Sequence, residues 1–83
     1  MNKIIIQIFL PANGNWYDIR VPESMYVYDL ATVLADLFSE IAKGFYYKSN
    51  ENVLCFRDTG QKLPQDKTLA ELKVCNRTKL MFV

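Results

Sequence analysis

The sequence predicts an α+β fold in which one long helix lies across a small mixed sheet. Alternating, β-branched runs fill residues 1–22, one stretch of helical period follows, and short apolar runs close the chain. The 83 residues are enough for one domain, 1–83, and a hydrophobic content of 51% is typical of a folded globule.

Residues 3–10 (KIIIQIFL) and 16–22 (WYDIRVP) are predicted to pair as a β-hairpin. Alternation in the two strands predicts one shared inner face, formed by Ile4, Ile6, Ile8, Leu10, Tyr17, Ile19 and Val21. Asn13-Gly14 between the strands favours a primed turn, whose two central residues both need positive φ. Pro22 ends the second strand, because proline has no N–H for the ladder.

A long helix is predicted over residues 26–44. Its apolar stripe consists of Val27, Leu30, Leu34, Leu37, Phe38 and Ile41. Ser24 is the expected N-cap, and Gly44 is placed to end the helix. Asp29 near the start and Lys43 near the end suit the helix dipole.

Short elements are expected after a polar loop. They are a strand in 53–58, a turn at 58–60, a strand or bend at Leu63, a single helical turn begun by Thr68, and a final strand in 78–83 (TKLMFV). Leu80 and Phe82 should point inward. Because the first and last strands are both strongly apolar, we expect them side by side at the centre of the sheet, which is the β-grasp arrangement.

Composition argues against several kinds of function. The net charge of +1 gives no electrostatic footprint for nucleic acid. The chain has no histidine, the commonest general base and metal ligand. Cys55 and Cys75 are too few for a metal cluster or a disulfide scaffold, so reduced thiols are expected. No pair of carboxylates is spaced for acid–base work, so we expect no catalytic, metal or cofactor site and no enzymatic activity.

The apolar run near the N-terminus is predicted to be a strand rather than a targeting segment. Gln7 interrupts it, and it is too short for a signal peptide or for a bilayer span. We therefore expect a cytoplasmic protein without membrane insertion.

From Gly60 to the end, the sequence resembles ubiquitin. The shared positions are Gly60, Leu63, Thr68, Leu69, Leu72, Val74, Leu80 and Phe82, without gaps. Within the ubiquitin-like proteins, residues 17–21 (YDIRV), with Val27 and Leu30 ten and thirteen positions after Tyr17, resemble the YukD/EsaB type. These small proteins are associated with type VII (WXG-type) secretion systems of Gram-positive bacteria. The resemblance implies a ubiquitin-like interaction module, serving as an accessory or regulatory component of such a system and binding its other components.

Modifiers and sulfur carriers with this fold act through a flexible tail that ends in Gly-Gly. The sequence ends at Val83 with no glycine after Gly60, so we expect a protein that is not conjugated. Two alternatives stay open. One is a generic ubiquitin-like binding domain of another assembly, and the other is a truncated modifier or sulfur carrier.

Partners are expected to bind the sheet surface that points away from the helix, as they do in ubiquitin. Carried over by position, Val83 keeps an apolar residue in the last strand, whereas Arg57 replaces one in the third strand. Aromatic residues and methionine, which are enriched at interface cores, also point outward or flank the helix. The predicted protein-binding residues are Phe9, Trp16, Val53, Arg57, Tyr46, Tyr47, Met81 and Val83. A homodimer contact is an alternative use of this apolar face.

Overall fold

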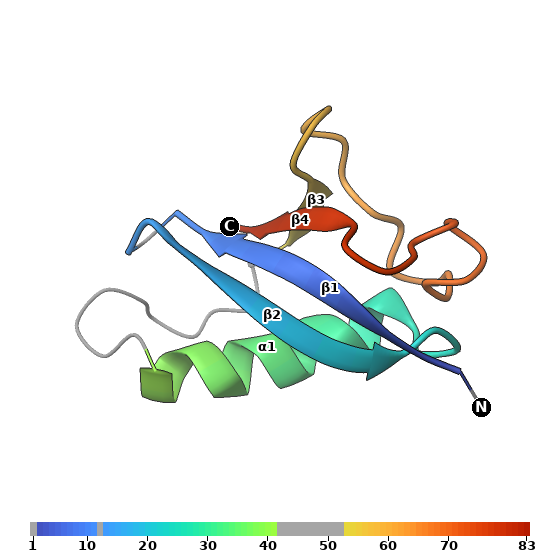
Figure 1. The fold of residues 1–83 in the computed structure, drawn as a ribbon, viewed down its shortest axis with the longest axis horizontal. Coiled ribbons are helices and arrows are strands. Elements are labelled where there is room, and N and C mark those ends of the chain that lie inside the picture. Colours follow the sequence, from blue (N-terminus) through green and yellow to red (C-terminus); the bar gives the residue numbers. More distant parts are fainter. Residues whose placement is uncertain (1, 12, 42–52) are drawn as a thin grey trace.

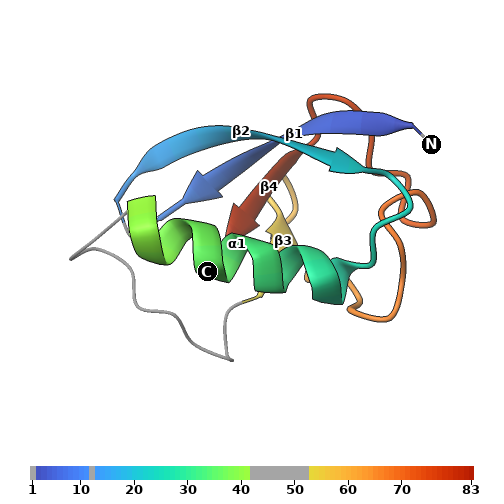
Figure 2. The same cartoon turned by 90° about the horizontal axis from the view of Figure 1, so that it is seen from below.

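The computed structural model describes residues 2–11, 13–41 and 53–83. The elements are β1 (Lys3–Leu10), β2 (Asn15–Pro22), α1 (Val27–Ile41), β3 (Leu54–Phe56) and β4 (Lys79–Phe82). The strands form one sheet in the order β2-β1-β4-β3, and α1 lies across one of its faces (Figures 1 and 2). The predicted α+β arrangement is confirmed.

Strand β1 lies in the middle of the sheet and hydrogen-bonds to a strand on each side. It pairs antiparallel with β2 along its whole length, with Ile6 opposite Ile19. It pairs parallel with β4, with Ile8 opposite Leu80. The prediction that the first and last strands are neighbours is therefore confirmed. β4 in turn pairs antiparallel with the short β3.

The core lies between the sheet and α1. The most deeply buried side chains are Ile6, Ile8, Leu10, Val27, Leu30, Leu34, Phe38, Leu54, Leu63, Leu69, Leu80 and Phe82. The Phe38 ring lies between two other rings, with its centroid 5.1 Å from that of Tyr17 and 5.8 Å from that of Phe82. Tilted ring pairs at these distances add about 0.5–1.5 kcal/mol each beyond the area that they bury.

The helix begins in a way that the sequence did not indicate. Ser24 lies in a turn before α1, so the predicted Ser24 N-cap is wrong. The first helical N–H groups bond instead to a distant loop: Val27 N–H donates to Lys67 O (2.9 Å) and Tyr28 N–H to Gln65 O (3.2 Å). These carbonyls replace the side-chain cap, because they satisfy amides that have no partner within the helix. Lys43 and Gly44 lie outside the described residues.

The hairpin turn also differs from the prediction. Leu10 pairs with Asn15, and Pro11, Asn13 and Gly14 lie in the turn between them. Gly14 has a φ of +72°, but Asn13 is not among the described residues with positive φ, so the predicted two-residue primed turn is wrong. Asn13 supports the turn with its side chain: Oδ1 accepts from Asn15 N–H (3.1 Å), and Nδ2 donates to Tyr17 Oη (2.8 Å).

The predicted helical turn at Thr68 is present, with Leu72 N–H donating to Thr68 O (3.3 Å). Thr68 and Glu71 form a reciprocal capping box. Thr68 N–H donates to Glu71 Oε1 (2.9 Å), and Glu71 N–H donates to Thr68 Oγ1 (3.1 Å). Two hydrogen bonds with Thr68 lower the pKa of Glu71 below its ordinary value of 4.5. The bond from the Thr68 N–H makes the larger contribution, and the bond with the Thr68 hydroxyl makes the smaller one.

Leu80 tests the core. It is fully buried at the centre of β4, so Leu80→Ala should lower the free energy of unfolding by about 2–5 kcal/mol through lost burial and a new cavity. Val33 on α1 is 47% exposed, and Val33→Ala should therefore have almost no effect. Urea unfolding of both variants measures the difference, and equal midpoints would contradict this account of the core.

The capping box predicts a pH effect. Because the pKa of Glu71 is lowered on folding, its carboxylate stabilises the fold fully above the ordinary value of 4.5, and this contribution is lost as the pH falls through the lowered pKa. Glutamine can accept the same hydrogen bond but does not titrate. Glu71→Gln should therefore be less stable than the wild type near neutral pH, and the two unfolding midpoints should converge on acidification. Glu40→Gln on α1 controls for loss of a surface charge, and a Glu71→Gln deficit that stays constant down to about pH 3 would count against the capping box.

Candidate functional site

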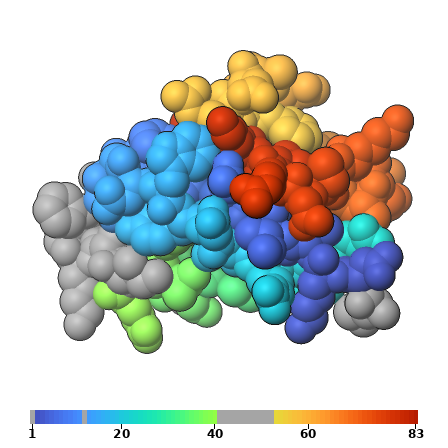
Figure 3. Space-filling model, viewed as in Figure 1, coloured from blue at the N-terminus to red at the C-terminus, as the bar shows by residue number. Residues whose placement is uncertain are grey.

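The outer face of the sheet is the surface that points away from α1. Since side chains alternate along a strand, every second residue of each strand lies on it. Its members are Lys3, Ile5, Gln7, Phe9, Trp16, Asp18, Arg20, Val53, Cys55, Arg57, Lys79, Met81 and Val83. In Figure 3 the blue, red and yellow segments form one continuous surface, and the green helix lies along its border.

One row of apolar side chains crosses this face over all four strands. Phe9 in β1 is paired with Trp16 in β2 and with Met81 in β4, and Met81 is paired with Cys55 in β3. We call these four residues the apolar row. Trp16 is 45% exposed, and Phe9 and Met81 are half-buried. The Phe9 and Trp16 ring centroids are 5.1 Å apart, at an interplanar angle of 44°.

Two cations lie over the aromatic rings of the apolar row. Arg57 Cζ is 5.6 Å from the Phe9 ring centroid, and Lys79 Nζ is 6.0 Å from that of Trp16. Both cations come from the next register row, where Lys79 is opposite Gln7 and Arg57 N–H donates to Lys79 O (3.0 Å). Such contacts contribute about 0.5–1 kcal/mol each at exposed sites. They place positive charge directly beside the apolar row.

Val53 and Val83 extend the apolar surface beyond β3 and β4. Each donates its N–H to the carbonyl of the other, at 2.8 and 3.0 Å, so the two residues lie directly opposite. Val83 is 46% exposed and Val53 is half-buried. The structure therefore brings six of the predicted binding residues onto the outer face: Phe9, Trp16, Val53, Arg57, Met81 and Val83. Tyr46 and Tyr47 lie outside the described residues. Binding by any of these side chains stays a prediction.

The residue at the centre of the third strand differs from the one that the positional comparison with ubiquitin indicated. β3 ends at Phe56, and Arg57 follows it in a turn. The central outward position of β3, opposite Met81, belongs to Cys55, which is only 8% exposed. Lys79 was not among the predicted site residues. Strand parity was the available signal, because Lys79, Met81 and Val83 alternate with the inward Leu80 and Phe82.

Charge is unevenly distributed between the two faces of the domain. The outer face carries Lys3, Arg20, Arg57 and Lys79 against the single acidic Asp18. The helix Val27–Ile41 carries Asp29, Asp36 and Glu40 and no basic residue. The small net charge of +1 is therefore the sum of a basic outer face of the sheet, an acidic helix and the remaining charged residues.

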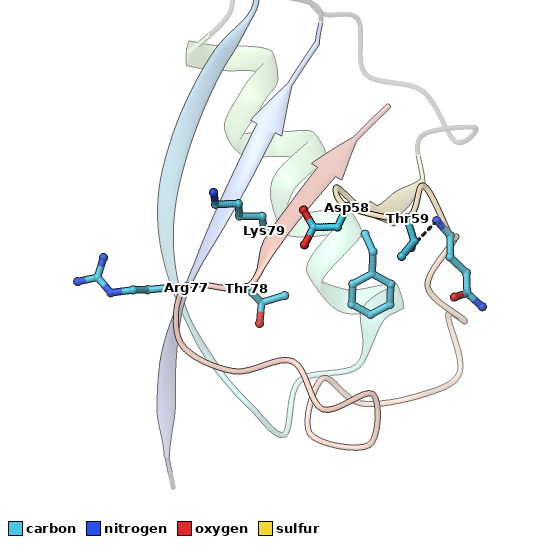
Figure 4. A pocket seen from close by; sticks show the side chains of 7 residues that line it. Asp58, Thr59, Arg77, Thr78 and Lys79 are labelled. Carbon is cyan, nitrogen blue, oxygen red and sulfur yellow. Dashed lines mark hydrogen bonds between the residues drawn. The ribbon is translucent and has the colours of Figure 1, made fainter.

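A hollow of about 560 Å³ lies beside the outer face, where the turn after β3 meets the start of β4 (Figure 4). It is lined by Phe56, Asp58, Thr59, Gln61, Arg77, Thr78 and Lys79. Figure 4 shows Arg77 and Lys79 extending away from Asp58 and Thr59. Thr59 Oγ1 accepts a hydrogen bond from Gln61 N–H (3.2 Å). The charged groups therefore do not meet at one point, as a nucleophile and its base would.

Both cysteines are free thiols, with Cys55 buried in β3 and Cys75 exposed. Within residues 2–11, 13–41 and 53–83, no three His, Cys, Asp or Glu side chains gather where they could hold a metal ion. Over those same residues, no helix has the length and apolar character needed to cross a membrane.

Comparison with known proteins identifies the fold. No protein-family model matches the sequence, and no curated protein matches it. The ubiquitin-like domain of EccD5 from Mycobacterium xenopi superposes with a TM-score of 0.75 at 15% identity, over 100% of this chain and 94% of that one. The UBL domain of Plasmodium falciparum Dsk2 superposes with a TM-score of 0.77 at 15% identity, over 99% and 97% of the two chains. The chain therefore has the ubiquitin-like β-grasp fold.

Proposed function

We propose that this chain is a protein-binding module that acts without enzymatic activity and without being conjugated. The observation that carries the proposal is the apolar row on the outer face, with an exposed Trp16 and two cations over its rings. Tryptophan and arginine are the residues most enriched at energetic centres of interfaces. The outer face combines both in one small area.

The partner that suits this surface presents an apolar side chain with acidic residues around it. The apolar side chain would cover Trp16 and Met81, whose side chains are exposed and half-buried, respectively. The acidic residues would meet Arg57 and Lys79. Charge complementarity of this kind chiefly raises the association rate and selects the partner.

For the biological setting, we propose an accessory or regulatory role in a type VII secretion system, in the cytoplasm. Its support is the resemblance of residues 17–21, Val27 and Leu30 to the YukD/EsaB type. In the structure these strand residues pair with β1, and Val27 and Leu30 are buried beneath the sheet, so the resemblance concerns how hairpin and helix pack together.

Gene neighbourhood separates this setting from the alternatives. Genes for a membrane ATPase with FtsK-like domains and for small WXG-type proteins should lie nearby. A neighbourhood of adenylating enzymes or molybdopterin synthesis would indicate a truncated modifier or sulfur carrier instead. If neither set of genes lies nearby, the alternative that remains is a ubiquitin-like binding domain of another assembly.

Trp16 tests the binding face. The binding partners to titrate are purified soluble domains of the secretion components encoded by the neighbouring genes. Trp16→Ala should raise the Kd for the partner roughly tenfold or more, because central tryptophans dominate interface energies. Val33→Ala, an exposed change on the opposite face, is the matched control. Unfolding curves must show that both variants fold. Unchanged affinity in Trp16→Ala would place the binding surface elsewhere.

The two cations make a separate prediction. The double variant Arg57→Ala with Lys79→Ala should slow association with the same partner and flatten the dependence of the association rate on salt, because both charges steer an acidic partner. Stopped-flow mixing at several ionic strengths measures this. A salt dependence equal to that of the wild type would contradict the proposed acidic partner.

A further inference from the structure

The outer edge of β2 has backbone groups that none of the described strands uses. In β1, the odd residues bond toward β4: Arg77 N–H donates to Ile5 O (2.7 Å) and Gln7 N–H donates to Thr78 O (3.0 Å). Successive residues of a strand direct their backbone groups to opposite sides, so the even residues of β1 bond to β2. Their partners there are Tyr17, Ile19 and Val21.

Trp16, Asp18 and Arg20, which alternate with these β2 residues, therefore direct their N–H and C=O groups away from the sheet. Among the described residues, none donates to or accepts from these groups at that edge. β2 has eight residues and ends in Pro22. A free edge of this length is a surface on which another strand can add.

Charge selects the strand that fits this edge. Asp18 and Arg20 lie on the same face of β2, are both exposed, and have opposite charges. Edges that resist pairing usually carry charges that repel or that point inward. Here, a second copy running antiparallel brings unlike charges together, because Asp18 of each copy comes to lie beside Arg20 of the other.

We propose that two copies of this chain associate through their β2 edges, antiparallel and centred on Ile19. In this register, Asp18 lies opposite Arg20 of the second copy on both sides of the two-fold axis. These are the residues with free outward backbone groups, so hydrogen bonds form at both pairs. On the inner face, the half-buried Ile19 meets Ile19 of the second copy.

Neighbouring registers fit less well. Centring on Asp18 places two carboxylates opposite each other, which is destabilising in a sheet. Centring on Arg20 opposes two guanidinium groups. It also moves Pro22, which has no N–H to donate, inward to a position opposite Asp18, whereas in the proposed register Pro22 lies opposite Trp16 at the ends of the pairing. If one strand shifts by one residue, residues whose backbone groups are free lie opposite residues whose backbone groups already bond to β1. The same shift places side chains of the outer face of one copy opposite side chains of the inner face of the other.

The dimer would have a functional consequence. Antiparallel addition extends the sheet, so the outer faces of both copies lie on the same side. The two Trp16 side chains would then face the same direction, and a partner with two binding segments would gain affinity through effective concentration. The edge contact is smaller than a standard interface, so the dimer should be weak and concentration-dependent.

Sedimentation equilibrium with charge-exchanged variants tests the dimer. Asp18→Arg and Arg20→Asp alone should each weaken self-association about tenfold, because each replaces both unlike pairs by like pairs. An equimolar mixture of the two variants should restore it, since every pair across the edge is again unlike. Val83→Asp, on the outer face but far from this edge, should leave self-association unchanged. Unfolding curves verify that the exposed substitutions leave the fold intact.

Disulfide trapping reads out the register. In a Cys75→Ser background, Ile19→Cys should form a covalent dimer on mild oxidation, because residues opposite at the axis lie within disulfide reach. The proposal is overturned by a wild type that stays monomeric at high concentration, or by a mixture that fails to restore association. Loss of the dimer in Val83→Asp would indicate contact through the outer face instead. Faster trapping of Asp18→Cys than of Ile19→Cys would overturn the register.

Discussion

The parallel pairing of β1 with β4 is the contact on which the rest of the structure depends. It joins the first and last strands of the chain, and Asn76 Oδ1 extends it by accepting the Ile5 N–H at 2.9 Å. Ile8 and Leu80, opposite each other across this pairing, are both fully buried beneath α1. Because β3 is attached to the sheet through β4, loss of this pairing would detach both β4 and β3 from the hairpin.

The loop between β3 and β4 connects the sheet to the start of the helix through hydrogen bonds. Its carbonyls at Gln65 and Lys67 accept the first N–H groups of α1, and Leu69 N–H donates to Met25 O (3.0 Å) before the helix. Leu69 is fully buried in the core. The helix therefore has its N-terminal amides satisfied only when the loop is in place, which couples helix, loop and sheet into one folding unit.

The same strand pairing assembles the surface that we propose as functional. Trp16, Phe9, Met81 and Cys55 come from four strands and form a row only because their registers coincide. The edge of β2 lies at the side of this surface. A dimer formed through that edge would enlarge the surface without covering it, so the two proposals concern separate contacts and are compatible.

Local pattern was enough to predict much of this protein from its sequence. Alternation identifies which side of β1 is buried, and the helical period identifies Leu30, Leu34 and Phe38 as core residues, because both depend on neighbouring positions alone. Strand parity also placed Trp16 and Met81 on the outer face. Only the tertiary structure decided how the helix begins, which residue occupies the centre of β3, and that Arg57 and Lys79 lie over Phe9 and Trp16. These features depend on which distant segments are hydrogen-bonded and in which register, and local pattern does not contain that information.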